Sequence, residues 1–233
     1  ILTEYASNGS LEDILELERM NKSIQGWNDT KKLINIYGIA SGMSYLHSKN
    51  ICHRSLKPSN IYIDDILTPK IGDFGLSTPF TNLNNITHQS ISGVKATPIY
   101  SSPEVLQSNE YSKMSDVYSF AFIVYEIISN EIPFSEIKNK TQIYNEVVVK
   151  QNRPIINESI NQSYRLLIES CWSQNPNDRP TFDDVVHVLR SDSGFITETI
   201  KNEDYQKYVN FIDERIKSQF EQEKIQEDEN IDP

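Results

Sequence analysis

The 233-residue sequence has little cysteine, no long apolar run and a minority of cationic side chains. Its two cysteines, Cys52 and Cys171, cannot form a disulfide framework, so we expect a reducing, cytoplasmic compartment. The longest largely apolar run, residues 120–128, is too short to cross a bilayer, and we expect neither membrane insertion nor a signal peptide. The net charge of −11 argues against a general binder of nucleic acids or membrane surfaces.

What remains is an ordinary soluble composition, with 37% hydrophobic and 24% charged residues. The length fits one large domain or two small ones and can bury a sizeable core. Acidic residues gather at the end of the chain, where residues 195–233 hold 11 acidic and 5 basic side chains. We therefore expect one domain over residues 1–190 and an acidic amphipathic tail or linker over residues 191–233.

Hydrophobic periodicity indicates a mainly helical chain. Helices are predicted at 11–15, 28–48, 115–130, 141–150, 161–173 and 181–190. Short strands are predicted at 1–5, 60–65 and 69–74. From residue 197 the tail has an amphipathic helical pattern, whose apolar face either packs on the domain, binds a partner or belongs to a partly ordered linker; we favour the linker.

Five motifs occur in order along the chain. They are HRSLKPSN at 53–60, IGDFG at 71–75, TPIYSSPEVL at 97–106, SDVYSFAFIVYEIISNEIPF at 115–134 and CWSQNPNDRPTF at 171–182. Together they resemble the C-terminal lobe of a protein kinase over about residues 1–190. The last motif is similar to the tyrosine-kinase-like and tyrosine-kinase groups. Lys57-Pro58 is similar to catalytic loops of the Ser/Thr type rather than to those of tyrosine kinases. The resemblance implies an α+β protein kinase-like fold with a mainly helical C-terminal lobe.

The resemblance also implies a site for ATP and Mg²⁺. Asn60 and Asp73 stand at the family's magnesium-ligand positions, and hard oxygen ligands suit Mg²⁺. Lys57 would meet the γ-phosphate as a point charge. Thr97 would brace Lys57 and the residue at the position of the catalytic base.

Adenine contacts are implied at the N-terminal end, where ILTEYASNGSL resembles the strand and hinge between the two lobes. Thr3 would be the gatekeeper, and the carbonyl of Glu4 and the amide of Ala6 would face the adenine edge. Tyr62 stands where the family usually has an aliphatic residue beneath adenine. Our hypothesis is that its extra volume crowds the pocket; the alternative is that its ring stacks on adenine.

Several positions match structural residues of the family. Glu104 and Arg179 resemble an ion pair that ties the activation segment to the late helices. Asp116 resembles the buried aspartate that holds the backbone of the catalytic loop. His53 and Phe74 resemble members of a stacked hydrophobic column through the lobe.

Residues 76–101 match the activation segment, which phosphorylation orders in the family through the catalytic-loop arginine, here Arg54. The candidate hydroxyl groups are Ser77, Thr78, Thr81, Thr87, Ser90 and Ser92. For any single one of them, we favour a solvated loop residue over a phosphorylation site.

The main departure from the family is Ser55, which stands where the catalytic aspartate would be. A serine hydroxyl is too weak a base near neutral pH to replace a carboxylate. Asp64 and Asp65 follow the predicted strand, and nothing directs them to the site. The glycine-rich loop, strand lysine and helix glutamate of the family would precede Ile1, so we expect an absent N-terminal lobe and poor ATP affinity for this chain alone.

Three functions compete on these residues. The first is a pseudokinase that acts as a binding or allosteric scaffold for protein partners in signalling. The second is a weakly active ATP-dependent Ser/Thr kinase with a protein substrate, and the third is an interaction module that does not use nucleotide. Ser55 disfavours the second, and the retained Lys57, Asn60 and Asp73 disfavour the third.

Overall fold

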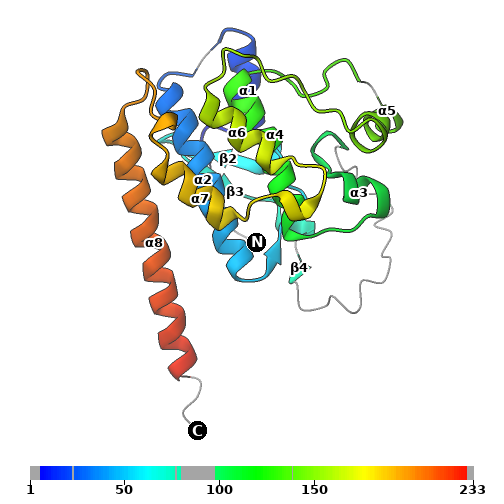
Figure 1. Ribbon diagram of the computed structural model, residues 1–233. Coiled ribbons are helices and arrows are strands. Elements are labelled where there is room, and N and C mark those ends of the chain that lie inside the picture. The colour runs from blue at the N-terminus through cyan, green and yellow to red at the C-terminus, as the bar shows by residue number, and fades with distance from the viewer. Residues whose placement is uncertain (1–5, 23, 77, 80–97, 138, 230–233) are drawn as a thin grey trace.

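The structure is a computed structural model that describes residues 6–22, 24–76, 78–79, 98–137 and 139–229 (Figure 1). Its helices are α1 (Leu11–Arg19), α2 (Asp29–Ser48), α3 (Pro103–Ser108), α4 (Lys113–Ser129), α5 (Lys140–Tyr144), α6 (Gln162–Cys171), α7 (Phe182–Ser191) and α8 (Asn202–Glu229). Its strands are β1 (Ile51–Cys52), β2 (Ile61–Ile63), β3 (Pro69–Ile71) and β4 (Thr78–Pro79). The strand predicted at residues 1–5 lies outside the described residues.

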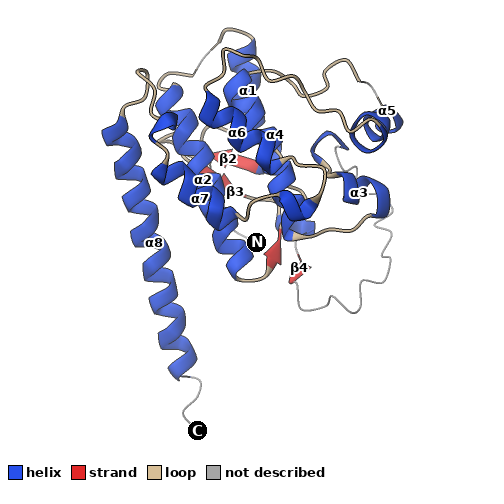
Figure 2. Cartoon of the chain, in the orientation of Figure 1, coloured by secondary structure: helices blue, strands red, loops and turns tan. Residues whose placement is uncertain are grey.

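Helices dominate the described residues, and the strands form two small two-stranded pieces of sheet (Figure 2). Strand β2 pairs with β3 in antiparallel register, with Ile61 opposite Ile71 and Tyr62 opposite Lys70. Strand β1 pairs with β4 in the same sense. The chain around Gly9 runs along the other edge of β2, because Ile63 donates its amide hydrogen to the Gly9 carbonyl at 2.9 Å.

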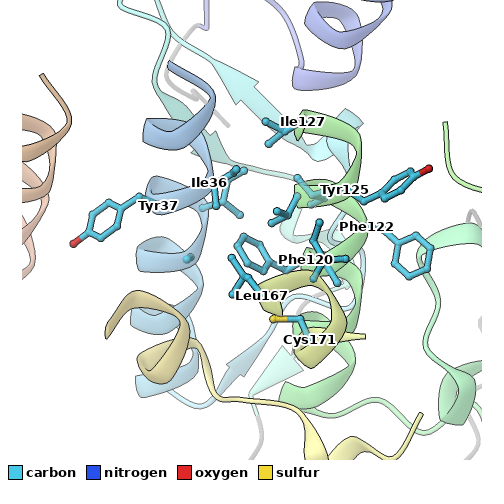
Figure 3. Packing of buried hydrophobic residues seen from close by; sticks show 14 of the residues in the cluster. Ile36, Tyr37, Phe120, Phe122, Tyr125, Ile127, Leu167 and Cys171 are labelled. Atoms are coloured by element: carbon cyan, nitrogen blue, oxygen red, sulfur yellow. The ribbon is translucent and has the colours of Figure 1, made fainter. Parts of the chain in front are cut away.

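The core lies between α2 and α4, with α6 packed against α4 (Figure 3). Helix α4 is buried on nearly every side because its sequence is apolar nearly all round. Phe120 and Ile127 in α4 and Ile36 in α2 are fully buried. Each such side chain contributes about 1.5–3 kcal/mol through its removal from water. The predicted helices at 28–48 and 115–130 therefore form the centre of the fold.

Local sequence signals set several helix ends. Asn28 caps α2 by accepting a hydrogen bond from the backbone of Lys31 at 3.1 Å. The six-residue α3 was not predicted, because it is too short to show periodicity; its signal is Pro103 at the first helical position. The structure also corrects the single helix predicted at 141–150, since α5 ends at Tyr144 and a π-helical turn follows over Asn145–Val149.

Helix α8 lies along α2 and contacts α7, and its C-terminal end extends past the rest of the molecule (Figure 1). Tyr205 and Val209 are buried there, and the Tyr205 hydroxyl donates to the Leu189 carbonyl at 2.9 Å. The edge of the Tyr205 ring meets Tyr37 of α2, with ring centroids 5.8 Å apart. Of the interpretations open for the tail, these contacts support packing on the domain rather than the linker that the sequence favoured.

A second contact ties α8 to the end of α2. The Tyr45 hydroxyl donates to Glu223 Oε1 at 2.9 Å, and Lys49 forms an ion pair with the same carboxylate. Phe220 adds a ring contact with Tyr45, with centroids 5.7 Å apart.

None of the described helices combines the length and apolarity that a bilayer span requires.

We expect Tyr205→Ala to lower the free energy of unfolding by about 3–5 kcal/mol, because it empties a buried aromatic site. Tyr205→Phe should cost about 1 kcal/mol, since it removes only the hydrogen bond to Leu189. The control is Phe211→Ala on the exposed side of α8. Urea unfolding measures all three; equal losses for Tyr205→Ala and Phe211→Ala would contradict the docked helix.

A buried carboxylic acid joins α4 to two other elements. Glu126 accepts a hydrogen bond from the Tyr100 hydroxyl at 2.5 Å and faces Arg19 Nη1 of α1 at 3.6 Å. Burial raises the pKa of Glu126 to about 7, and the Tyr100 and Arg19 contacts only partly oppose this shift. Folding therefore favours the protonated acid, and its stabilising contribution is lost as the pH rises through 7.

We expect Glu126→Gln to gain stability relative to the native protein as the pH rises, by about 1–2 kcal/mol between pH 5.5 and pH 8. The amide keeps an acceptor for Tyr100 but cannot ionise. Urea unfolding of both proteins at several pH values measures this difference. A difference that stays constant with pH, or that changes in the opposite direction, would show that Glu126 titrates as an ordinary carboxyl group.

Candidate active site

The expected catalytic loop is anchored by one buried carboxylate, that of Asp116 at the start of α4. Asp116 Oδ2 accepts the amide hydrogen of His53 at 2.8 Å, and Oδ1 accepts that of Arg54 at 2.8 Å. His47 Nε2 near the end of α2 lies 3.0 Å from Oδ2. Hydrogen bonds to an ionised acceptor are stronger than neutral ones, so Asp116 fixes the loop to both central helices.

The anchor holds a sharp backbone turn. Arg54 has φ +66°, in the left-handed region that non-glycine residues adopt at a cost of about 1–2 kcal/mol. The hydrogen bond from its amide to Asp116 offsets that cost. The guanidinium of Arg54 lies 5.5 Å from the centroid of the Tyr111 ring, and its Nε is buried without an acceptor among the described residues.

Ser55 follows this turn and faces Asn60. The Asn60 amide nitrogen donates to the Ser55 carbonyl at 2.6 Å and to the Ser55 hydroxyl oxygen at 3.0 Å. Ser55 donates its own amide hydrogen to His53 Nδ1 at 3.3 Å. Residues 53–60 are therefore held by hydrogen bonds within the loop. The side chain at position 55 is a neutral hydroxyl instead of a carboxylate.

The loop is joined directly to the segment that follows β3. Gly72 donates its amide hydrogen to the Asn60 carbonyl at 2.9 Å, and the Gly72 carbonyl lies 2.9 Å from His53 Nε2. The rings of His53 and Phe74 meet edge to face, with centroids 5.4 Å apart. Asp73 stands between these contacts with φ +59° and an exposed side chain. Asn60 and Asp73 therefore lie on two backbone segments that are hydrogen-bonded to each other.

The aspartates after β2 are not substitutes for the missing carboxylate. Asp64 Oδ1 accepts the amide hydrogen of Thr68 at 2.7 Å, and Oδ2 accepts its hydroxyl hydrogen at 2.6 Å. Asp65 is exposed in the same turn. These side chains stabilise the connection between β2 and β3, as their position after a strand indicated.

The other predicted site residues differ in burial, and several of them lie outside the described residues. Lys57 is half-buried and precedes the 3₁₀ turn Pro58–Asn60. Tyr62 is exposed on β2, and Ala6 is partly buried in the chain before α1. Thr3, Glu4 and Thr97 lie outside the described residues, as do Ser77, Thr81, Thr87, Ser90 and Ser92. Thr78 lies in β4, which pairs with β1.

Glu104 and Arg179 form a buried ion pair between α3 and the chain before α7. Arg179 Nη1 and Nη2 donate to the two Glu104 oxygens at 2.7 and 2.9 Å. Arg179 also donates to the Met114 and Ser173 carbonyls and lies over the Tyr118 ring. Burial opposes ionisation of Glu104, but hydrogen bonding and charge from Arg179 outweigh it and hold the pKa of Glu104 below its usual value.

The model of the protein kinase domain family matches residues 1–189. The chain belongs to the protein kinase family. Its fold is accordingly the protein kinase fold, here mostly helical with few strands in the described residues. The motif order that carried the resemblance therefore identified the family correctly.

Three curated kinases illustrate the similarity. The dual specificity protein kinase shkC of Dictyostelium discoideum is 34% identical over 191 residues, 81% of this chain and 36% of that protein. The serine/threonine-protein kinase CTR1 of Arabidopsis thaliana is 35% identical over 192 residues, 82% of this chain and 22% of that protein. The RGS domain-containing serine/threonine-protein kinase A of Dictyostelium discoideum is 38% identical over 190 residues, 82% of this chain and 16% of that protein. The chain thus spans well under half the length of these relatives.

Kinases generally bind ATP with Mg²⁺, and the described donors fit such a cation. The nitrogen of the Asn60 amide is used within the loop, so its Oδ1 is the atom for a cation. Asp73 carries an exposed carboxylate in the segment that Gly72 joins to Asn60 by a backbone hydrogen bond. Two hard oxygen donors suit Mg²⁺, which usually completes its shell with phosphate oxygens and water. Among the described residues, no three carboxylate, imidazole or thiol side chains gather as an all-protein metal site.

Sequence reasoning missed two residues of the kinase site. His47 contacts the Asp116 carboxylate, although the sequence placed it only within the helix predicted at 28–48. Gly72 binds both Asn60 and His53 through its backbone. A glycine before Asp73 was the available signal, but its partners come from a distant part of the chain. Cys52 lies beside this site, and burial raises the pKa of its thiol to about 12, so it stays protonated.

We expect Arg179→Ala to lower the free energy of unfolding by about 3–5 kcal/mol, because it leaves Glu104 partly buried without its cation. The matched control is Lys207→Ala, which breaks the exposed pair between Lys207 and Asp204 and should leave the urea midpoint unchanged. Similar midpoints for the two variants would show that the buried pair does not stabilise the fold.

Proposed function

We propose that the protein is a pseudokinase of the tyrosine-kinase-like Ser/Thr group that acts as a binding or allosteric scaffold in signalling. The observation that carries the proposal is the Ser55 hydroxyl at the base position, held against Asn60 in an otherwise complete catalytic loop. A carboxylate there would accept or orient the proton of the substrate hydroxyl. Its loss slows transfer by about 10²–10⁴-fold, or roughly 3–5 kcal/mol of transition-state stabilisation.

Retained side chains support nucleotide binding as part of the scaffold. Asn60 and Asp73 would hold Mg²⁺, and Lys57 would contact the γ-phosphate. Bound Mg²⁺ would neutralise charge on the phosphates. Arg54 supports regulation through the activation segment, because its buried Nε lacks an acceptor among the described residues and a phosphate oxygen would supply one.

The group, partners and location are parts of the same proposal. Names of relatives include both Ser/Thr and dual specificity kinases, which supports a signalling role and protein partners. The two buried cysteines are free thiols, which is compatible with a cytoplasmic location. A weakly active Ser/Thr kinase is the second candidate, favoured by the retained Lys57, Asn60 and Asp73.

We expect Ser55→Asp to raise phosphotransfer by the full-length natural protein at least 100-fold over its native rate, since it restores the base to an intact loop. The matched control is Ser59→Asp, which adds a carboxylate to the same loop at a position other than that of the catalytic base. The double variant Ser55→Asp/Asp73→Asn should lose the gain, because the cation ligand is removed. Transfer of labelled γ-phosphate to a generic protein substrate and to the protein itself measures the rates.

Equal rates for the native protein and Ser55→Asp would overturn the pseudokinase proposal in favour of an active kinase. Failure of both to bind Mg·ATP in an equilibrium titration would favour the interaction module instead. A gain with Ser59→Asp as large as that with Ser55→Asp would show that the position of the carboxylate does not matter.

A further inference from the structure

Helix α2 meets strand β3 across two glycines. Gly38 and Gly42 are four residues apart, so they lie on the same face of the helix. A Cβ atom built on Gly42 would lie 2.7 Å from Ile71 Cδ1, and one built on Gly38 would lie 2.6 Å from Pro69 Cγ. Both distances are well inside van der Waals contact. The two glycines therefore let β3 lie directly against the backbone of α2.

A tyrosine of α8 completes this junction. The Tyr208 hydroxyl lies at the same point above Gly38 as the ring of Pro69, since a Cβ atom built there would collide with both. The Tyr208 ring meets Tyr37 edge to face, with centroids 6.3 Å apart. Burial raises the pKa of Tyr208 above its usual value, and the negative charge of Asp64 raises it further. The hydroxyl is therefore a neutral group between α2 and the connection from β2 to β3.

Strand β3 leads directly from this junction to a proposed cation ligand. Ile71 ends the strand, and Gly72 donates its amide hydrogen to the Asn60 carbonyl at 2.9 Å. Gly72 is also closely packed, because a Cβ atom built on it would lie 2.6 Å from Cε2 of Tyr62. Asp73 is the next residue. Closely packed groups transmit a displacement instead of absorbing it, so a shift of β3 would move Asp73 relative to Asn60.

We propose that Tyr208 is a positioning residue for the carboxylate of Asp73. Its hydroxyl holds the start of β3 against Gly38, and the strand then sets where Asp73 lies relative to Asn60. The ligand affected is the Mg²⁺ of a bound nucleotide, so the inference rests on the proposed function. Helix α8 lies beyond residues 1–189, which the family model matches. A docked tail outside the matched region would thus be required for full affinity at the cation site.

The test is a double-mutant cycle on the full-length natural protein, with dissociation constants for Mg·ATP measured by titration calorimetry. Tyr208→Phe and Tyr208→Ala are each made in the native protein and in the Asp73→Asn variant. The matched control is Tyr205→Phe, which removes a hydroxyl from the same helix but from a bond to the Leu189 carbonyl of α7. Thermal unfolding of each variant establishes that it is folded.

A second readout is the electron paramagnetic resonance spectrum of Mn²⁺ in the complex with Mn·ATP, which depends on the ligands of the cation. Tyr208→Ala should change this spectrum, and Tyr205→Phe should leave it unchanged. These spectra decide the proposal if Asp73→Asn binds too weakly to titrate.

Tyr208→Phe should weaken Mg·ATP binding about threefold and Tyr208→Ala about tenfold, the usual size of couplings carried by packed side chains. In the Asp73→Asn background the same changes should alter binding less than about twofold, because the group that Tyr208 positions is already lost. Tyr205→Phe should bind Mg·ATP like the native protein. If Tyr208→Ala does not fold, Tyr208→Phe decides by the same comparison, with its own Mn²⁺ spectrum in place of that of Tyr208→Ala.

Losses of the same size in the native and Asp73→Asn backgrounds would overturn the positioning role, because Tyr208 would then act without Asp73. Equal losses for Tyr208→Phe and Tyr205→Phe would overturn it too, since any loosening of α8 would suffice.

Native-like Mg·ATP binding by both Tyr208 variants would overturn this inference alone, and weaker binding by Asp73→Asn would still support the proposed function. Absence of Mg·ATP binding by the native protein would overturn both the inference and the proposed nucleotide site.

Discussion

The arrangement of the site depends on the buried carboxylate of Asp116. It accepts the amide hydrogens of His53 and Arg54 and contacts His47, so a single side chain joins α2, α4 and the catalytic loop. Removing this acceptor would leave two amide groups of the loop unsatisfied, at a cost of about 1–3 kcal/mol each. It would also release the left-handed turn at Arg54. Residues 55–60 directly follow the two anchored residues, so the positions of the Ser55 hydroxyl and the Asn60 amide depend on this anchor.

Because the anchor does not involve position 55, the fold and the chemistry of the loop can change independently. The bonds from Asn60 to Ser55 use a backbone carbonyl that any residue supplies and a hydroxyl that replaces a carboxylate. The link from the loop to Gly72, and the ring contact between His53 and Phe74, are likewise made by groups outside position 55. The hydrogen bonds that hold the loop are therefore compatible with a serine at position 55.

The sequence predicted local features well and distant packing poorly. Helical periodicity located α2 and α4, because each buries a long apolar surface. The same periodicity showed that α8 has an apolar face, but it could not show what this face packs against. Its contacts include Tyr37, from a helix that is distant in the sequence. The contact between Tyr62 and Gly72 could not be predicted from the sequence, because it depends on strand register and on the missing Cβ atom of Gly72. His47 was overlooked for the same reason: its partner Asp116 is 69 residues away.

If Ser55 separates binding from transfer, the native protein should hold Mg·ATP without consuming it. The most direct measurement incubates the full-length natural protein with an equimolar amount of γ-labelled ATP and Mg²⁺, then recovers the bound nucleotide and determines the mass of the protein. We predict that the nucleotide is recovered as intact ATP, that EDTA releases it and that the protein carries no label. Recovery of ADP with a matching amount of labelled phosphate, on the protein or in solution, would contradict this account.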